Sequence, residues 1–175
     1  VDHILFAFFK VKYDGTIENF SVDGTMVTNL GNITTNVKMN IPDFNGSKAV
    51  YSGSVMADNL QIGDFLKLPL LGSVSLKEDF SGNSFDPDLV QLKIDGNIQH
   101  IRIDSYTYHN ITTHGLVAKK QFNGSLLIDD PNLALSFDGG IDYGGKNVAV
   151  NATAYLLVCN FKALHLTKDQ VTLSA

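Results

Sequence analysis

Apolar residues recur at every second position along most of this chain. Leu133, Leu135 and Phe137 alternate with small or polar residues, and segments 92–98 and 148–154 repeat the pattern. A spacing of two places side chains on one face of a β-strand, whereas a helix needs spacings of three and four. The sequence therefore predicts an all-β protein built on antiparallel strands, with one apolar and one polar sheet face.

Glycines and turn signals indicate how this sheet is shaped. Asp-Gly or Asn-Gly pairs, which support the positive φ of tight hairpin turns, occur six times. Gly96 and Gly124 lie inside alternating segments, where a glycine typically marks a bulge or bend, so we expect strong curvature. Only residues 64–68, before Pro69, suit a short helix, so little or no helix is expected.

We expect one β-rich unit over residues 1–175, because no linker-like composition divides the chain. Segments that begin at Gly15, Gly53 and Gly96 share a loose pattern of glycine, aliphatic residue and two alternating apolar residues. Their spacing of about 40 residues is in the range of stacked repeats. The chain starts at Val1 without a signal-peptide pattern, which predicts either a processed protein or a piece of a larger one.

Charge and motif content exclude several function classes. Thirteen Lys and Arg against 18 Asp and Glu give a net charge of -5, which argues against a nucleic-acid partner. Cys159 is the single cysteine, so neither an internal disulfide nor a cysteine zinc cluster is expected. His109 and His114 have no zinc-binding spacing, and the sequence contains no phosphate loop or nucleophile elbow. We therefore predict no metal, no cofactor and no enzymatic activity.

Adjacent carboxylates do not change this interpretation. Glu78-Asp79 and Asp129-Asp130 are neighbours in the sequence, and neighbours on a strand point to opposite faces. Neither pair suits acid/base catalysis, so no catalytic residue is proposed. Asp-Asp-Pro-Asn at 129–132 is typical of a turn.

The apolar stripe is the remaining candidate for function. A sheet with one apolar face must cover it with a second sheet, with helices, by its own curling or with a ligand. Because no helix of useful length is predicted, the alternatives are a closed, self-filled sandwich or barrel and an open trough that binds lipid. Large exposed apolar patches are uncommon, so the residues alone favour the closed core.

Several motifs, in their order and spacing, resemble a known family. They are LQIGDFLKLPLLGSVSL at 60–76, SGNSFDP at 81–87, YTYHNI at 106–111 and FNGSLLIDDPNLALSFDG at 122–139. Together they resemble TamB-type translocation and assembly module proteins of the AsmA-like group. The resemblance implies a curved antiparallel β-sheet trough, a half-pipe or β-taco, with an apolar interior.

The resemblance also implies a location and partners. The chain would be a periplasmic segment of a Gram-negative envelope protein that is anchored in the inner membrane and acts in outer membrane biogenesis. Its ligand would be phospholipid or another acyl chain. An outer membrane assembly-machinery protein (BamA/TamA-like) would bind other parts of the parent chain, and a weak homodimer could cover the exposed trough.

The residue pattern and the resemblance together predict a lipid-binding groove, in which acyl chains would be buried without directional contacts. Two alternatives stay open: a chaperone-like module that accepts a strand of an outer membrane protein, and a structural or adhesive cell-surface β domain. The predicted groove residues are Val74, Leu76, Leu92, Ile94, Ile98, Leu126, Ile128, Leu133, Leu135, Phe137, Val148 and Val150.

Overall fold

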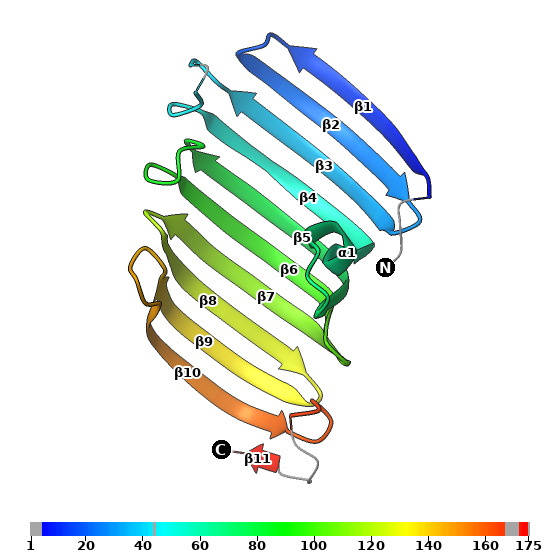
Figure 1. Ribbon diagram of the computed structural model, residues 1–175, viewed down its shortest axis with the longest axis vertical. Coiled ribbons are helices and arrows are strands. Elements are labelled where there is room, and N and C mark those ends of the chain that lie inside the picture. The colour runs from blue at the N-terminus through cyan, green and yellow to red at the C-terminus, as the bar shows by residue number, and fades with distance from the viewer. Residues whose placement is uncertain (1–4, 44, 167–171, 175) are drawn as a thin grey trace.

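The computed structural model describes residues 5–43, 45–166 and 172–174, and they form one antiparallel sheet (Figure 1). Each strand pairs with the next along the chain, so the sheet order is the sequence order. The strands are β1 (Ala7–Gly15), β2 (Asn19–Thr28), β3 (Gly31–Asn40), β4 (Val50–Gln61), β5 (Leu71–Asn83), β6 (Gln91–Ile103), β7 (Tyr106–Ala118), β8 (Gln121–Asp130), β9 (Leu133–Asp142), β10 (Ala149–Asn160) and β11 (Thr172–Ser174).

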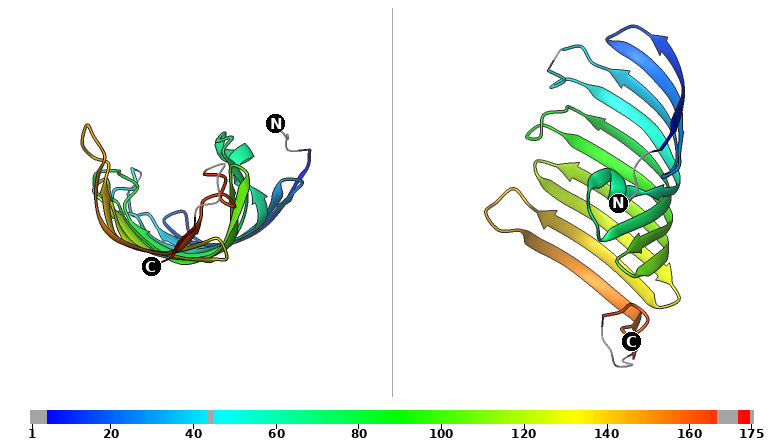
Figure 2. Two further views of the ribbon diagram at one scale, coloured as in Figure 1. Left: turned by 90° about the horizontal axis from the view of Figure 1, so that it is seen from below. Right: turned by 45° about the vertical axis from the view of Figure 1, so that its right-hand side comes forward.

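The sheet is open, and this confirms the predicted fold class. Seen along its long axis, it has a U-shaped cross-section, with the strands running across the U (Figure 2, left). β1 and β10 do not pair with each other, so the sheet does not close into a barrel. The described residues contain no second sheet to fill the U, which excludes the closed, self-filled core that the residues alone favoured.

The predicted short helix is confirmed, but it begins two residues earlier than expected. α1 covers Ile62–Leu66, between β4 and β5. It ends at Leu66 because Lys67 adopts a left-handed conformation, with φ of 57°, and its N–H donates to the Gly63 carbonyl. α1 lies on the concave side of the sheet (Figures 1 and 2).

Strand register brings the apolar residues of neighbouring strands onto one face. Directly opposite residues in an antiparallel pair point to the same side, so a continuous register produces rows of like side chains across the sheet. One row of successive partners crosses β5 to β9 through Leu76, Ile98, Ile111, Ile128 and Leu135.

The apolar face is the concave one. Ala57, Leu60 and Val74 form the buried cluster, and Ile62 and Phe65 of α1 pack against it. Because α1 lies inside the U, the face that carries this cluster is the inner face of the sheet. Polar residues between these positions, such as those of β5 and β6, point to the outer face.

Curvature is strong, but it does not come from bulges at the predicted glycines. The register runs without a shift through Gly96, opposite Glu78, and through Gly124, opposite Gly115. Register shifts lie elsewhere. They occur in β4 between Ala57 and Leu60, in β5 between Leu71 and Val74 and between Ser75 and Leu76, and in β10 between Leu156 and Val158. The register therefore shows no bulge at Gly96 or Gly124, the two glycines that were expected to mark a bulge or bend.

The glycines that begin the three loosely similar segments take different places in the sheet. Gly15 ends β1, whereas Gly53 lies within β4 and Gly96 within β6. The register places Gly53 opposite Phe80, and it places Gly96 opposite Glu78, in the neighbouring row.

Candidate functional site

The concave apolar surface of β1 to β10, which we call the trough, is the candidate site. Rows of directly paired residues run along it from one edge of the sheet to the other. One row consists of Phe9, Met26, Ile33, Ala57, Leu76, Ile98, Ile111, Ile128, Leu135 and Leu156. The neighbouring row consists of Val11, Gly24, Thr35, Val55, Glu78, Gly96, Thr113, Leu126, Phe137 and Ala154.

Aromatic side chains lie flat across glycines on the floor of the trough. The Phe122 ring lies over Gly115, where an added Cβ would be 2.3 Å from Phe122 Cε2. The Tyr51 ring lies over Gly82 in the same way, with 2.8 Å to the position of an added Cβ. A ring that lies down on a glycine covers the backbone and does not project into the lumen, so the trough stays wide.

Described residues cover parts of both margins of the trough. On the margin opposite α1, the Phe85 ring stacks on the Tyr51 ring, with ring centroids 5.3 Å apart. α1 lies over the ends of β4 and β5, where it buries Val74. The turn at 161–166 packs at the end of β10, where Leu164 is 4% exposed and Cys159 is 5% exposed. His165 Nδ1 of this turn lies 2.9 Å from Ser105 Oγ of the β6–β7 turn. Most other trough side chains are half-buried, and those of the outer strands are exposed.

The structure brings ten of the twelve predicted groove residues together in the open trough. Val74 belongs to the same face, but it is 1% exposed beneath α1 and cannot touch a ligand there. Val148 precedes β10 and is 66% exposed in the β9–β10 connection. The ten are Leu76, Leu92, Ile94, Ile98, Leu126, Ile128, Leu133, Leu135, Phe137 and Val150.

Sequence reasoning missed the N-terminal half of the trough. β1 to β4 contribute to the same surface, and β1 is exposed along its whole length. The signal was present, because these residues also alternate with polar ones at a spacing of two. The missed residues include Phe9, Val11, Tyr13, Phe20, Val22, Met26, Ile33, Val37, Met39, Tyr51 and Val55.

Glu78 interrupts the apolar floor. Its Oε1 accepts a hydrogen bond from Thr113 Oγ1 at 2.8 Å, whereas its Oε2 is buried without a partner among the described residues. Burial raises the pKa of Glu78; the Thr113 hydrogen bond opposes this rise, and the nearby charge of Asp95 adds to it.

Asp130 anchors the ends of β7 to β9. Its side chain is fully buried and accepts hydrogen bonds from Tyr106 Oη at 2.5 Å, from the Asn132 N–H at 2.8 Å and from the His109 N–H at 3.1 Å. Burial alone would raise the pKa of Asp130, but these hydrogen bonds outweigh burial and lower it. This network is structural, because every donor is a neighbouring strand end or turn.

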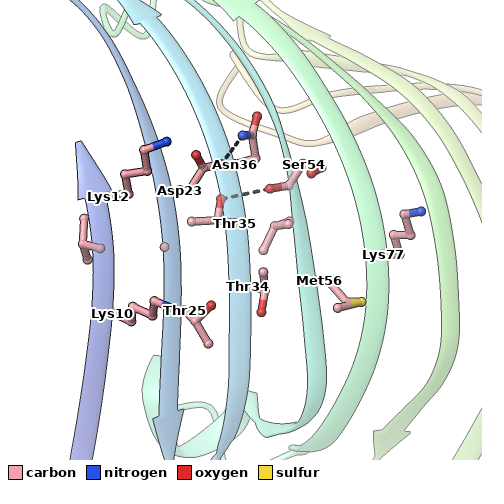
Figure 3. Close-up of a pocket in the computed structure, with 13 residues that line it drawn as sticks. Lys10, Lys12, Asp23, Thr25, Thr34, Thr35, Asn36, Ser54, Met56 and Lys77 are labelled. Atoms are coloured by element: carbon pink, nitrogen blue, oxygen red, sulfur yellow. Dashed lines mark hydrogen bonds between the residues drawn. The ribbon is translucent and has the colours of Figure 1, made fainter. Parts of the chain in front are cut away.

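The outer face of the sheet carries most of the polar side chains, together with exposed apolar ones such as Phe8, Leu116 and Leu127. A shallow depression over β1 to β5 is lined largely by this face, including Lys10, Lys12 and Lys77 (Figure 3). Asp23 accepts a hydrogen bond from Asn36 there. Most of the residues that line the depression are polar or charged, whereas those of the trough are mostly apolar.

The histidines singled out in the sequence lie beside carboxylates. His109 Nδ1 is 3.1 Å from Asp130 Oδ2, and His114 Nδ1 is 2.8 Å from Asp95 Oδ1. Among the described residues, no three His, Cys, Asp or Glu side chains are grouped to hold a metal ion. The candidate site is therefore the trough, whose apolar side chains support the burial of apolar surface.

Comparison with known proteins finds no matching family model, no matching curated protein and no matching solved structure. Within the described part of the chain, no helix has the length and apolarity needed to cross a membrane. The function is therefore inferred from the shape and chemistry of the trough.

Proposed function

We propose that this chain binds acyl chains of phospholipid in the trough and serves as a lipid-binding or lipid-conducting segment of a periplasmic protein in outer membrane biogenesis. One observation carries the proposal: the sheet is a single layer whose apolar concave face continues across ten strands and is covered by the described residues only at parts of its margins. A soluble chain that keeps such a surface open needs a partner for it.

The energetics suit an acyl chain. Each buried methylene contributes about 0.8 kcal/mol, and this contribution needs no directional contact. Ten strands spaced about 4.8 Å apart give the trough a length of about 43 Å along its axis. Because similar side chains repeat along this axis, a bound chain meets a similar free energy at each position and can slide.

The shape also separates tail from headgroup. The strand ends and hairpin turns at the rim carry polar residues, including Lys119, Lys120 and Asp142. A phospholipid with its tails on the trough floor would place its headgroup near this rim, in water.

A pair of neighbouring substitutions tests the proposal. Phe137 points into the trough, whereas Ser136 points to the outer face of the same strand. We expect Phe137→Asp to abolish the phospholipid that native mass spectrometry detects after mild purification, because a buried charge on the floor opposes acyl binding. Ser136→Asp introduces the same charge on the outer face and should retain lipid.

Circular dichroism and thermal unfolding would establish that both variants fold. Wild-type protein that never carries or takes up lipid, under any purification condition, would contradict the proposal. Equal loss of lipid in Phe137→Asp and Ser136→Asp would place the binding outside the trough.

The edge of β1 favours a second candidate function. All nine residues of Ala7–Gly15 are exposed, and their outer backbone groups are unpaired in the described sheet. Such an edge can accept an extended strand of another protein, as in a chaperone for outer membrane proteins. Crosslinking from β1 to an unfolded β-barrel substrate, competed by a strand peptide and not by lipid, would support this candidate.

The resemblance to TamB-type proteins agrees with either role. On that interpretation the parent protein is anchored in the inner membrane, and an outer membrane assembly-machinery protein binds other parts of the parent chain. We propose no enzymatic activity for the trough, because its floor presents apolar side chains in place of convergent reactive groups.

A further inference from the structure

Glu78 lies in the middle of the trough floor, on β5. Its direct partners are Val55 on β4 and Gly96 on β6. Leu76 and Phe80 stand on the same face, two residues away on either side. A carboxyl group is thus placed on a surface that is otherwise suited to acyl chains.

The carboxyl group lies flat on the floor and is only half satisfied. A Cβ added at Gly96 would be 2.5 Å from Glu78 Oε2, so the missing side chain of Gly96 makes room for this oxygen. Thr113 Oγ1 donates to Oε1, and within the part of the chain that the structure describes no hydrogen-bond partner meets Oε2. A buried oxygen without a donor is tolerated far better on a neutral carboxylic acid than on a carboxylate.

Among the residues that the structure describes, no basic group on the trough floor compensates a charge at Glu78. The β4 residues beside it, 54–56, are uncharged. Lys77 and Asp79 flank it on β5 and point to the outer face, as does Asp95 on β6. The charge of Asp95 is already shared with Lys93 at 3.0 Å and with His114 of β7 at 2.8 Å. The protein surroundings therefore favour the neutral acid.

We infer that Glu78 makes acyl-chain binding in the trough pH-dependent, with tight binding when its carboxyl group is protonated and weaker binding when it is ionised. This inference rests on the proposed lipid-binding function. An acyl chain laid over Glu78 removes water from the carboxyl group and disfavours its charge further. Binding is then linked to uptake of a proton.

The linkage fixes the sign of the effect. Because the bound state favours the protonated form, the pKa of Glu78 is higher with ligand than without it. The affinity is constant below the ligand-free pKa and falls up to tenfold per pH unit as the pH rises from that value to the ligand-bound pKa. Above the bound pKa it reaches a second, lower plateau.

The test uses laurdan, a neutral naphthalene dye with a lauroyl chain, so that the probe itself does not titrate. Its dissociation constant is measured by fluorescence across a pH series for wild type, Glu78→Gln and Glu18→Gln. Glu18 lies in the exposed β1–β2 turn and is the matched control. We expect affinity to fall with pH in wild type and Glu18→Gln, and to stay at its tight value in Glu78→Gln.

The outcomes separate this inference from the function on which it rests. Laurdan binding with the same pH dependence in wild type and Glu78→Gln would overturn the role of Glu78 and leave the trough as the binding site. No laurdan binding by any variant at any pH would overturn both proposals.

A second measurement does not need a variant that folds. Glu18 and Glu78 are the only glutamates of the chain, so ¹³C-labelled glutamate gives two carboxyl signals. Adding laurdan should move the titration midpoint of the Glu78 signal to higher pH. A midpoint that is the same with and without laurdan would overturn the inference.

Discussion

Glu78 and Asp130 both belong to the apolar side of the sheet, but their hydrogen-bond partners differ. Asp130 receives donors from Tyr106, His109 and Asn132, whereas one oxygen of Glu78 receives none from the described residues. Removing the negative charge at neutral pH should therefore destabilise the protein at Asp130 and stabilise it at Glu78.

Asp130→Ala should destabilise the fold by about 3 kcal/mol at neutral pH, because three donors lose a charged acceptor. The pKa of Asp130 is lowered in the folded state, so its stabilisation is present above the unfolded pKa and is lost as pH falls through the folded pKa. Urea unfolding of both proteins at neutral and at acid pH checks this. A difference that stays unchanged at acid pH would contradict the role of the ionised carboxylate.

Glu78→Gln should stabilise the protein at neutral pH. The pKa of Glu78 is raised by folding, so the native state binds more protons than the unfolded chain, and stability falls as pH rises through the folded pKa. Glutamine mimics the neutral acid and removes this loss. Thermal unfolding across a pH series should show a higher Tm for the variant at neutral pH and a shrinking difference toward acid pH; a lower Tm at neutral pH would refute the argument.

The floor glycines should differ in their tolerance of a methyl group. A Cβ at Gly53 would meet the Asn36 carbonyl oxygen at 2.1 Å, whereas a Cβ at Gly115 meets only atoms of the Phe122 ring. A ring can swing away and a paired strand cannot, so Gly53→Ala should cost about 2 kcal/mol and Gly115→Ala less than about 1 kcal/mol. Denaturant unfolding of the two variants would rank them, and the reverse order would contradict the flat-floor geometry.

At the scale of elements, α1 creates the one place where the described sheet has a second layer over its apolar cluster. Ile62 and Phe65 cover Val74, whereas Val117, a trough residue of β7, is half-buried. The same residue type is therefore structural under the helix and a lining residue elsewhere.

Val74→Ala should cost about 2 kcal/mol and leave laurdan binding unchanged, because Val74 is sealed from the trough. Val117→Ala, the matched control, should cost less than about 1 kcal/mol. Denaturant unfolding and dye titration on the same samples would check both parts. Weaker dye binding by Val74→Ala than by Val117→Ala would show that α1 moves off the sheet.

At the scale of the whole molecule, the sheet has open edges, and β1 is a long one. Its outer face carries Lys10 and Lys12, and edge lysines oppose edge-to-edge pairing because a second strand would bury or repel their charge. Replacing both by threonine should promote self-association in analytical ultracentrifugation. Lys38→Thr, on the outer face of the internal strand β3, is the control and should stay unchanged.

The strand pattern could be predicted because a spacing of two is a local property. Leu133, Leu135 and Phe137 indicate a strand and its inward face without knowledge of any partner. The same rule explains why ten predicted groove residues share one surface, and it would have identified β1 to β4 had it been applied there. The different positions of Val74 and Val148 could not be predicted, because both residues match the alternating pattern. Val74 is covered because α1 packs on it, and Val148 lies outside the trough because β10 begins one residue later.

Local alternation was thus sufficient for the all-β class and for two unlike faces, because it depends on residues next to one another in the chain. Whether the apolar face would be sealed or open depended on curvature and on which strands failed to meet, and these follow from contacts across the whole sheet. The buried network of Asp130 joins residues 21 to 24 positions apart, and the unpartnered oxygen of Glu78 exists only because three strands align Gly96 and Thr113 beside it. Such alignments arise in the folded sheet and have no counterpart in any short stretch of sequence.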